Sequence, residues 1–138
     1  MTKSTGTEAA ALAAGTPEST TDAPTTRLPV YCFDIDGTIC SNTEGAYEAA
    51  EPFSDAIAAL NALYDAGHRI HLHTARGSST GIDWRELTER QLREWGVRYH
   101  CLFMGKPSAD VYIDDKTINA QAWRRSGFTL TLSQARRE

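Results

Sequence analysis

Two acidic side chains one residue apart give this chain its clearest chemical signal. Asp34 and Asp36 follow an apolar run, Val30 to Phe33, whose β-branched and aromatic residues favour a buried strand. Residues two apart in a strand point to the same side, so both carboxylates would lie where the chain leaves the strand. Gly37 indicates that the backbone turns there and opens the carboxyl end of the strand to a ligand. Because like charges this close repel each other, we expect a cation beside them.

Three further polar positions follow apolar or alternating runs downstream. They are Thr74 after His68 to His73, Lys106 after Tyr99 to Met104, and Asp114-Asp115 after Asp110 to Ile113. Singly, each has a plain structural explanation as a strand end, a solvated loop charge or a turn before a helix. Because the carboxyl ends of parallel strands converge on one crevice, we expect these groups to meet the two aspartates there.

The elements that would position these residues can be predicted from periodicity and from start and stop signals. Strands are expected from Val30 onward and over 68–73, 99–104, 110–113 and 128–132, with helices over about 52–66, 84–95 and 117–125. This alternation predicts an α/β fold: a three-layer, doubly wound, mostly parallel sheet covered by helices on both faces. One connection is short, because only Gly105 to Ala109 separate the third and fourth strands, whereas parallel neighbours normally need a dozen residues or more.

Composition predicts a single domain with a tail. The 138 residues, of which 41% are hydrophobic, suffice for one core, so we expect a domain over 29–138. Residues 1–28 are mostly Thr, Ala, Ser, Gly and Pro, which predicts a disordered N-terminal tail. Three cysteines without paired spacing indicate reduced thiols and a cytoplasmic protein. No apolar run approaches the ~20 residues of a membrane span.

Taken together, these motifs resemble those of the haloacid dehalogenase-like (HAD) phosphohydrolases. The resemblance rests on Asp34-Ile35-Asp36-Gly37-Thr38 after an apolar strand, then Thr74, Lys106 and Asp114-Asp115 in the expected order, and it covers about residues 29–131. A response-regulator receiver places its acidic residues in another order, and the dehalogenase branch lacks the second aspartate. The family resemblance therefore implies a phosphatase.

The resemblance also implies roles for these residues. Asp34 would be the nucleophile that forms an aspartyl-phosphate, and Asp36 would protonate the leaving oxygen and then activate water. Thr74 and Lys106 would contact the phosphoryl oxygens. Mg²⁺ would be held by the Asp34 carboxylate, the Asp36 backbone and Asp114, with Asp115 as a ligand or a neighbour acting through water.

The gaps between motifs are too short for a cap domain, so the chain is expected to be capless. Thr74-Ala75-Arg76-Gly77, Trp95-Gly96-Val97 and Gly105-Lys106-Pro107 resemble small capless phosphatases of capsule and surface-polysaccharide biosynthesis. This points to a small sugar or polyol phosphate as substrate. An open site of this kind would suit either a macromolecular phosphate or a small substrate that is enclosed by the protein's own loops or by a neighbouring subunit of a homo-oligomer.

Two other functions stay open. Ile113-Asp114-Asp115 followed by Trp123-Arg124-Arg125 resembles the phosphatase domain of polynucleotide kinase-phosphatases, although a formal net charge of −4 is a poor match for nucleic acid. A non-catalytic phosphate-binding or scaffold protein is the other alternative.

Three basic residues near the predicted site each have two interpretations. Arg76 would either bind a second group of the substrate or pair with a nearby carboxylate, Asp83 or Glu86. The spacing of His71 and His73 resembles that of a pair of metal ligands. Histidines two apart on a strand are, however, more often side chains on one face of the sheet than metal ligands.

Overall fold

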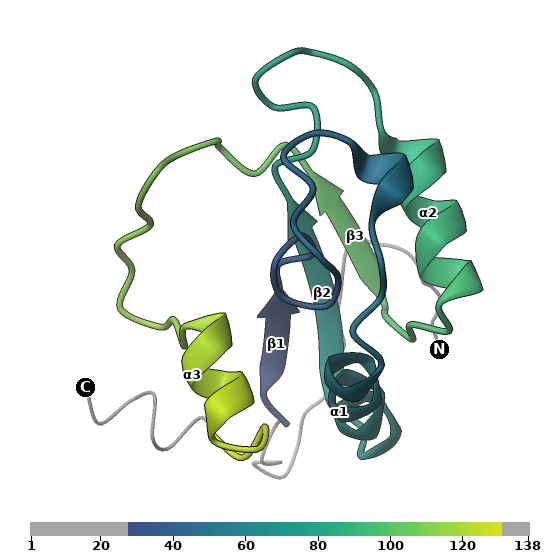
Figure 1. Cartoon of the computed structure of the whole chain (residues 1–138). Coiled ribbons are helices and arrows are strands. Elements are labelled where there is room, and N and C mark those ends of the chain that lie inside the picture. Colours follow the sequence, from purple (N-terminus) through teal and green to yellow (C-terminus); the bar gives the residue numbers. More distant parts are fainter. Residues whose placement is uncertain (1–27, 131–138) are drawn as a thin grey trace, which may run out of the picture.

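The computed structural model describes residues 28–130, and these form a three-stranded parallel sheet with helices packed against it (Figure 1). The elements are β1 (Val30–Phe33), the 3₁₀ turn η2 (Tyr47–Ala49), α1 (Ser54–Asp65), β2 (Arg69–Thr74), α2 (Arg85–Glu94), β3 (Cys101–Met104) and α3 (Ala120–Arg125). The strands lie in the order β1-β2-β3. The predicted parallel α/β class is therefore confirmed.

Helix α1 and strand β2 follow directly from their sequence periods. Ile57 and Leu60 lie one turn apart and are buried, and Gly67, at φ +98°, reverses the chain after the helix. In β2 the alternate residues Ile70 and Leu72 are fully buried, as a period of two requires. Helix α2 begins at Arg85, one residue later than predicted, and Trp84 occupies its N-cap position.

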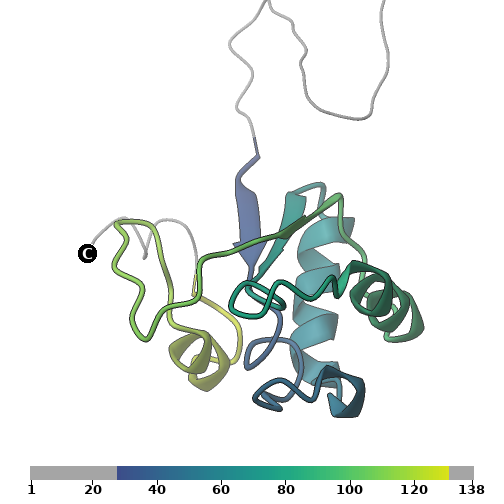
Figure 2. The same cartoon turned by 90° about the horizontal axis from the view of Figure 1, so that it is seen from above.

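One face of the sheet carries the core. Phe33 pairs in register with Leu72, and both contribute to a single cluster with buried residues of all three helices. Trp123 of α3 lies 5.4 Å from the Phe33 ring, so α3 packs on the same face as α1 and α2 (Figure 2).

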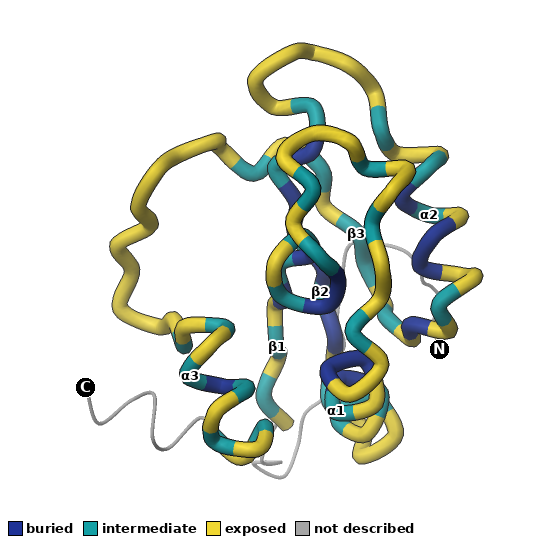
Figure 3. The backbone as a smooth tube through the Cα atoms, viewed as in Figure 1, coloured by how far each residue is buried: buried dark blue, intermediate teal, exposed yellow. Residues whose placement is uncertain are grey.

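The opposite face is only partly covered by the residues described. Cys32 and Phe103 are exposed there, and His71 and His73 between them are half-buried. In Figure 3, both β1 and β3 carry positions that are coloured as exposed. The predicted second helical layer is therefore absent from residues 28–130, and Cys32 is not buried as its apolar neighbours suggested. Helices on one face make this part of the molecule two layers deep.

Two predicted strands do not form in the described residues. Asp110 to Ile113 lie in an exposed loop, and Phe128 to Leu130 are irregular, while 131 and 132 fall outside the described range. The first error has a physical reason, because Gly105 to Ala109 are too few residues to return the chain to the amino end of the sheet. Residues 105–119, between β3 and α3, form no helix either.

The chain is capless over the residues described. Between β1 and α1 there is only a loop with the turn η2, and between α2 and β3 only a short connection. The tail predicted for residues 1–28 lies outside the described residues apart from Leu28. Among residues 28–130, no helix has the length and apolar character needed to cross a bilayer.

Candidate active site

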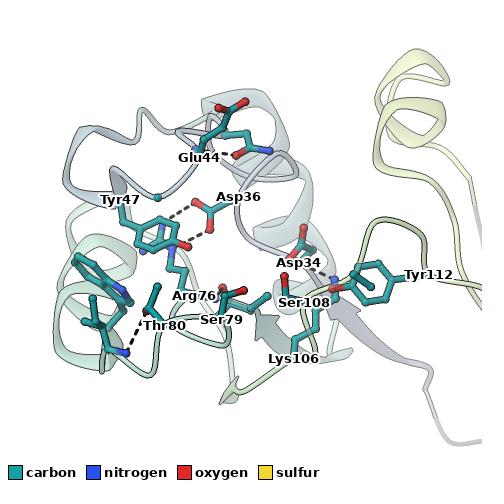
Figure 4. A pocket seen from close by; sticks show the side chains of 18 residues that line it. Asp34, Asp36, Glu44, Tyr47, Arg76, Ser79, Thr80, Lys106, Ser108 and Tyr112 are labelled. Carbon is teal, nitrogen blue, oxygen red and sulfur yellow. Dashed lines mark hydrogen bonds and ion pairs between the residues drawn. The ribbon is translucent and has the colours of Figure 1, made fainter.

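A cavity of about 440 Å³ opens at the carboxyl ends of the strands, where the sequence predicts the reactive groups to converge (Figure 4). Its lining includes four predicted site residues that come from different segments: Asp34, Asp36, Thr74 and Lys106. Arg76 also lines it, together with hydroxyl and aromatic side chains of the surrounding loops: Tyr47, Ser79, Thr80, Trp84, Ser108 and Tyr112. The structure thus brings together most of the predicted site.

Asp34 is an accessible carboxylate of this cavity. Its Oδ1 lies 3.5 Å from Lys106 Nζ, and its Oδ2 accepts a hydrogen bond from the Thr38 hydroxyl at 3.4 Å. The side chain remains 37% exposed, so these contacts leave room for a ligand. A carboxylate beside one ammonium group and open to a cavity can approach an electrophilic centre of a bound molecule.

Lys106 is held at the cavity by its backbone and by an aromatic ring. Its N–H donates to the Thr74 carbonyl at 3.0 Å, and its carbonyl accepts from the Ser78 hydroxyl. The ammonium group lies over the Tyr112 ring, 4.3 Å from the centroid. Figure 4 shows Lys106 between Asp34 and Tyr112. The site therefore places one positive charge next to the Asp34 carboxylate.

Thr74 ends β2 with a buried hydroxyl that faces the cavity. Its Oγ1 accepts a hydrogen bond from the Arg76 N–H at 3.1 Å, and the residue is 1% exposed. Because a hydroxyl both donates and accepts, its own O–H stays available to an oxygen atom of a ligand.

Arg76 pairs with Asp36, which the sequence did not indicate. Its Nε and one terminal nitrogen donate to the two oxygens of Asp36, each at 2.9 Å. The guanidinium is fully buried, whereas Asp36 is 17% exposed. This two-bond geometry fixes the plane of the carboxylate at the edge of the cavity.

The remaining Arg76 donors are also engaged by the protein. The other terminal nitrogen donates to Thr88 Oγ1 at 3.0 Å and to Gln91 Oε1 at 2.7 Å, and the guanidinium carbon lies 4.7 Å from the Tyr47 ring centroid. The pairing with Asp83 or Glu86 considered from the sequence is therefore wrong. A substrate contact by Arg76 stays an untested prediction, but its donors already have partners.

The predicted acidic pair of the fourth motif does not reach the cavity. Asp114 and Asp115 are exposed, lie on the loop that follows Lys106, and are absent from the cavity lining. Their nearest charged neighbour is Lys116, 3.9 Å from Asp115. The structure separates these two residues from Asp34.

This separation decides how the described residues fit a magnesium ion. No cluster of three or more His, Cys, Asp or Glu side chains in residues 28–130 is arranged to hold a metal. Both side-chain oxygens of Asp36 are bonded to Arg76, so Asp34 and the exposed Glu44 are the accessible acids of the cavity lining. Mg²⁺ prefers several oxygen ligands in octahedral geometry, so the arrangement as it stands lacks donors.

Burial also shapes the thiol and imidazole groups near the site. Burial, with Asp36 nearby, raises the pKa of the Cys40 thiol to about 12, so Cys40 is a neutral core residue. Burial likewise lowers the pKa of His71 and His73, and the charged groups Arg69 and Lys106 act in the same direction. Both rings lie against Phe103 as face residues of the sheet.

Several residues of the site escaped the sequence interpretation. Thr38 belongs to the first motif but was given no role, and the two Arg76 partners on α2 were not identified. Thr88 and Gln91 lie three residues apart on the buried face of that helix. Polar residues at apolar-face positions of a helix are a usable signal for a buried charge, because they provide its hydrogen bonds.

Comparisons with known proteins support the fold. No family model and no curated protein matches the chain. The crystal structure of an MCSG target from Vibrio cholerae is similar, with a TM-score of 0.65 and 22% identity over 80% of this chain and 95% of that one. At this identity the likeness concerns the fold alone.

Two complexes are more distant. A structure of the Pnkp1/Rnl/Hen1 complex matches with a TM-score of 0.49 and 20% identity, over 75% of this chain and 36% of that chain. A structure of the Pnkp1/Rnl/Hen1 RNA repair complex gives 0.48 and 22%, over 70% and 32%. Neither carries an argument about function. With its parallel β1-β2-β3 sheet, flanking helices and capless build, the chain shares its α/β fold with the Vibrio cholerae protein.

Proposed function

We propose that the protein is a phosphomonoester hydrolase that transfers the phosphoryl group to Asp34 and then to water. The observation that carries this proposal is the accessible Asp34 carboxylate in the cavity, with Lys106 Nζ 3.5 Å from it and the Thr74 hydroxyl in the same lining. The HAD-like fold makes a phosphatase a plausible function. A nucleophile, a cation and a hydroxyl donor are the groups that such a transfer needs.

The position of each residue in the cavity determines its role in the proposed reaction. Asp34 attacks phosphorus in line with the departing alcohol, and Lys106 and Thr74 stabilise the charge on the phosphoryl oxygens. Asp36 acts as general acid toward the leaving oxygen and then as general base toward water. In this scheme Arg76 contacts neither the phosphoryl group nor the attacking water. It positions the Asp36 carboxylate through its two hydrogen bonds.

We further propose a small sugar or polyol phosphate as substrate and Mg²⁺ as cofactor. A cavity of about 440 Å³ lies in the usual range for small molecules, and the Ser79, Thr80 and Ser108 hydroxyls in its lining suit a polyhydroxylated ligand. The HAD-like fold suggests Mg²⁺, although the donors of a single chain are too few in this arrangement. The three free cysteines agree with the reducing cytoplasm.

The test is turnover of a generic aryl phosphate in the presence of Mg²⁺, with and without a chelator. Asp34→Asn should abolish turnover while leaving the fold unchanged, because the substitution is nearly isosteric and removes the nucleophile. Asp65→Asn serves as a matched control, since Asp65 is exposed and pairs with Arg98 outside the cavity lining. A variant at position 34 that keeps more than about a thousandth of the wild-type rate would contradict the covalent route.

A substrate panel follows the same assay. Sugar phosphates and polyol phosphates should be hydrolysed with higher kcat/KM than 3′-phosphorylated oligonucleotides. The reverse order would favour a polynucleotide 3′-phosphatase, and binding of phosphate without any turnover would favour a scaffold.

A further inference from the structure

One end of the cavity has a wall of aromatic and apolar side chains. Tyr47 and Trp84 line the cavity, with their ring centroids 5.0 Å apart and their planes at 82° to each other. Ile82 lies in the same lining and is 53% exposed. These three residues are here called the apolar wall. Because large apolar residues exposed in a cavity commonly mark the surface that a ligand covers, the apolar wall is a candidate contact for part of the substrate.

The two aromatic rings of the apolar wall are held by the protein itself. Gln91 Nε2 donates a hydrogen bond to the Tyr47 carbonyl at 2.7 Å, and the Arg76 guanidinium carbon lies 4.7 Å from the Tyr47 ring centroid. Trp84 packs against the turn at Gly77, where an added Cβ would lie 3.2 Å from Trp84 Cδ1. The apolar wall is therefore formed before a ligand arrives, which lowers the cost of ordering it on binding.

Hydroxyl groups lie next to the apolar wall. Ser79 and Thr80 line the cavity and belong to the same loop as Ile82. The Thr80 hydroxyl oxygen accepts a hydrogen bond from the Ile82 N–H at 3.2 Å, so its own O–H remains available to a ligand. This end of the cavity therefore offers an apolar surface and hydroxyl groups side by side, which suits a ligand with an apolar face and a polar edge.

The apolar wall lies on the side of the cavity where the leaving group would depart. In Figure 4, Tyr47 lies on one side of Asp36, whereas Asp34 and Lys106 lie on the other side. Arg76 joins Asp36 to the apolar wall, because its guanidinium bonds both carboxylate oxygens at 2.9 Å and lies against the Tyr47 ring. In the proposed reaction the phosphoryl group is at Asp34 and the leaving oxygen faces Asp36. The alcohol attached to that oxygen then extends toward the apolar wall.

We propose that the apolar wall binds the leaving alcohol of the substrate, and that this alcohol is a sugar in its closed-ring form rather than an open-chain polyol. A closed ring presents its C–H groups as a rigid face and its hydroxyls around the edge, as the lining of the cavity requires. An open-chain polyol has no such face and loses more conformational freedom when it binds. The inference rests on the proposed function for the phosphate ester, but the preference for a ring is a property of binding.

The first experiment compares kcat/KM for two pairs of phosphate esters with Mg²⁺ present throughout. The pairs are glucose 6-phosphate with glucitol 6-phosphate, and mannose 6-phosphate with mannitol 6-phosphate. The members of each pair share their carbon chain and phosphate position and differ in ring closure. The wild type should prefer the ring member by about tenfold, the scale on which an apolar pocket discriminates. Equal values within both pairs, or higher values for the open chains, would overturn the inference.

Variants of the apolar wall connect this preference to its residues. Ile82→Ser and Trp84→Ala should bring the ratio of the two kcat/KM values close to one, whereas Ile82→Leu should keep it. Leu28→Ser is the matched control, because Leu28 is 47% exposed and lies outside the cavity lining. A variant that is merely less stable lowers both values and leaves their ratio unchanged. A ring preference that survives both Ile82→Ser and Trp84→Ala would overturn the inference.

The second experiment measures binding without turnover. Dissociation constants of the same four esters are determined by calorimetry with Asp34→Asn, and again with Ile82→Ser added to it. The ring esters should bind more tightly than the open-chain esters to Asp34→Asn, and the difference should disappear in the double variant. Equal dissociation constants within both pairs for Asp34→Asn would overturn the inference. If the wild type hydrolyses none of the esters but this binding difference is found, the proposed hydrolase function fails and the role of the apolar wall stands.

Discussion

At the scale of single residues, Arg76 is both a structural and a chemical part of the site. Its guanidinium is fully buried and donates to Asp36, Thr88 and Gln91, so one charge joins the first motif to helix α2. A buried cation whose N–H groups donate to Asp36, Thr88 and Gln91, and to the Cys40 sulfur at 3.9 Å, has little freedom to move. The orientation of Asp36 is therefore set by the core rather than by the ligand.

Arg76→Ala should destabilise the protein by about 3–5 kcal/mol, because it leaves the Asp36 charge and two polar groups of α2 without partners. Arg90→Ala is the matched control. Arg90 pairs with Glu94 at 3.9 Å on an exposed surface, and such pairs contribute about 1 kcal/mol or less. Urea unfolding of both variants measures the difference, and equal losses would show that the buried pair adds nothing.

Cys40 should make stability depend on alkaline pH. Burial raises the pKa of its thiol from 9.0 to about 12, so above pH 9 the unfolded chain releases this proton while the folded chain keeps it. Ionisation then stabilises the unfolded state, and the contribution of Cys40 is lost as pH rises from about 9 toward 12. Unfolding free energies measured from pH 8 to 10.5 should fall more steeply in the wild type than in Cys40→Ala. Parallel slopes would contradict the assignment.

At the scale of elements, the loop between β2 and α2 supplies one side of the cavity. Gly77 and Gly81 both have φ near +80°, and the Gly81 N–H donates to the Gly77 carbonyl at 2.8 Å. The two positions differ in how much room they leave for a Cβ atom. A Cβ at Gly77 would lie 2.1 Å from the Ile82 carbonyl oxygen, whereas a Cβ at Gly81 would meet nothing within 4 Å.

Gly77→Ala should therefore cost clearly more stability than Gly81→Ala. Each substitution places an L-residue in the left-handed backbone conformation, which costs about 1–2 kcal/mol of stability. Only Gly77→Ala must also displace the backbone at Ile82. Because Ser79, Thr80 and Ile82 line the cavity, Gly77→Ala should also raise KM for the natural substrate. Thermal unfolding and kinetics of the two variants provide the comparison, and similar values for both would mean that the loop adapts freely.

The sequence allowed prediction of those elements whose signals are local. Helix α1 and strand β2 carry clear periods, and the convergence of Asp34, Thr74 and Lys106 follows from the rule that parallel strands end at one edge. Arg76 and Asp36 lie 40 residues apart, and no periodic pattern in the sequence links them. Their pairing could therefore be found only from the structure. The prediction of a strand over 110–113 was wrong. The β-forming residues there do not indicate whether the connection before them is long enough to reach the sheet.

At the scale of the whole molecule, a capless sheet with one covered face leaves the cavity open. The three helices pack on the face that carries the core, and the cavity lies at the carboxyl ends of the strands between loops (Figures 1 and 4). Nothing in the described residues forms a lid over Asp34. In the proposed reaction, water would then be excluded by the substrate and the surrounding loops.

The most direct test of the account is whether the phosphoryl group passes through Asp34. Wild type and Asp36→Asn are mixed with a phosphate ester and Mg²⁺, quenched in acid within the first turnover, digested and examined by mass spectrometry. The account predicts a phosphoryl group on the peptide that contains Asp34, with more of it in Asp36→Asn because water activation is lost there. Turnover by the wild type with no phosphoryl group on that peptide in either protein would contradict it.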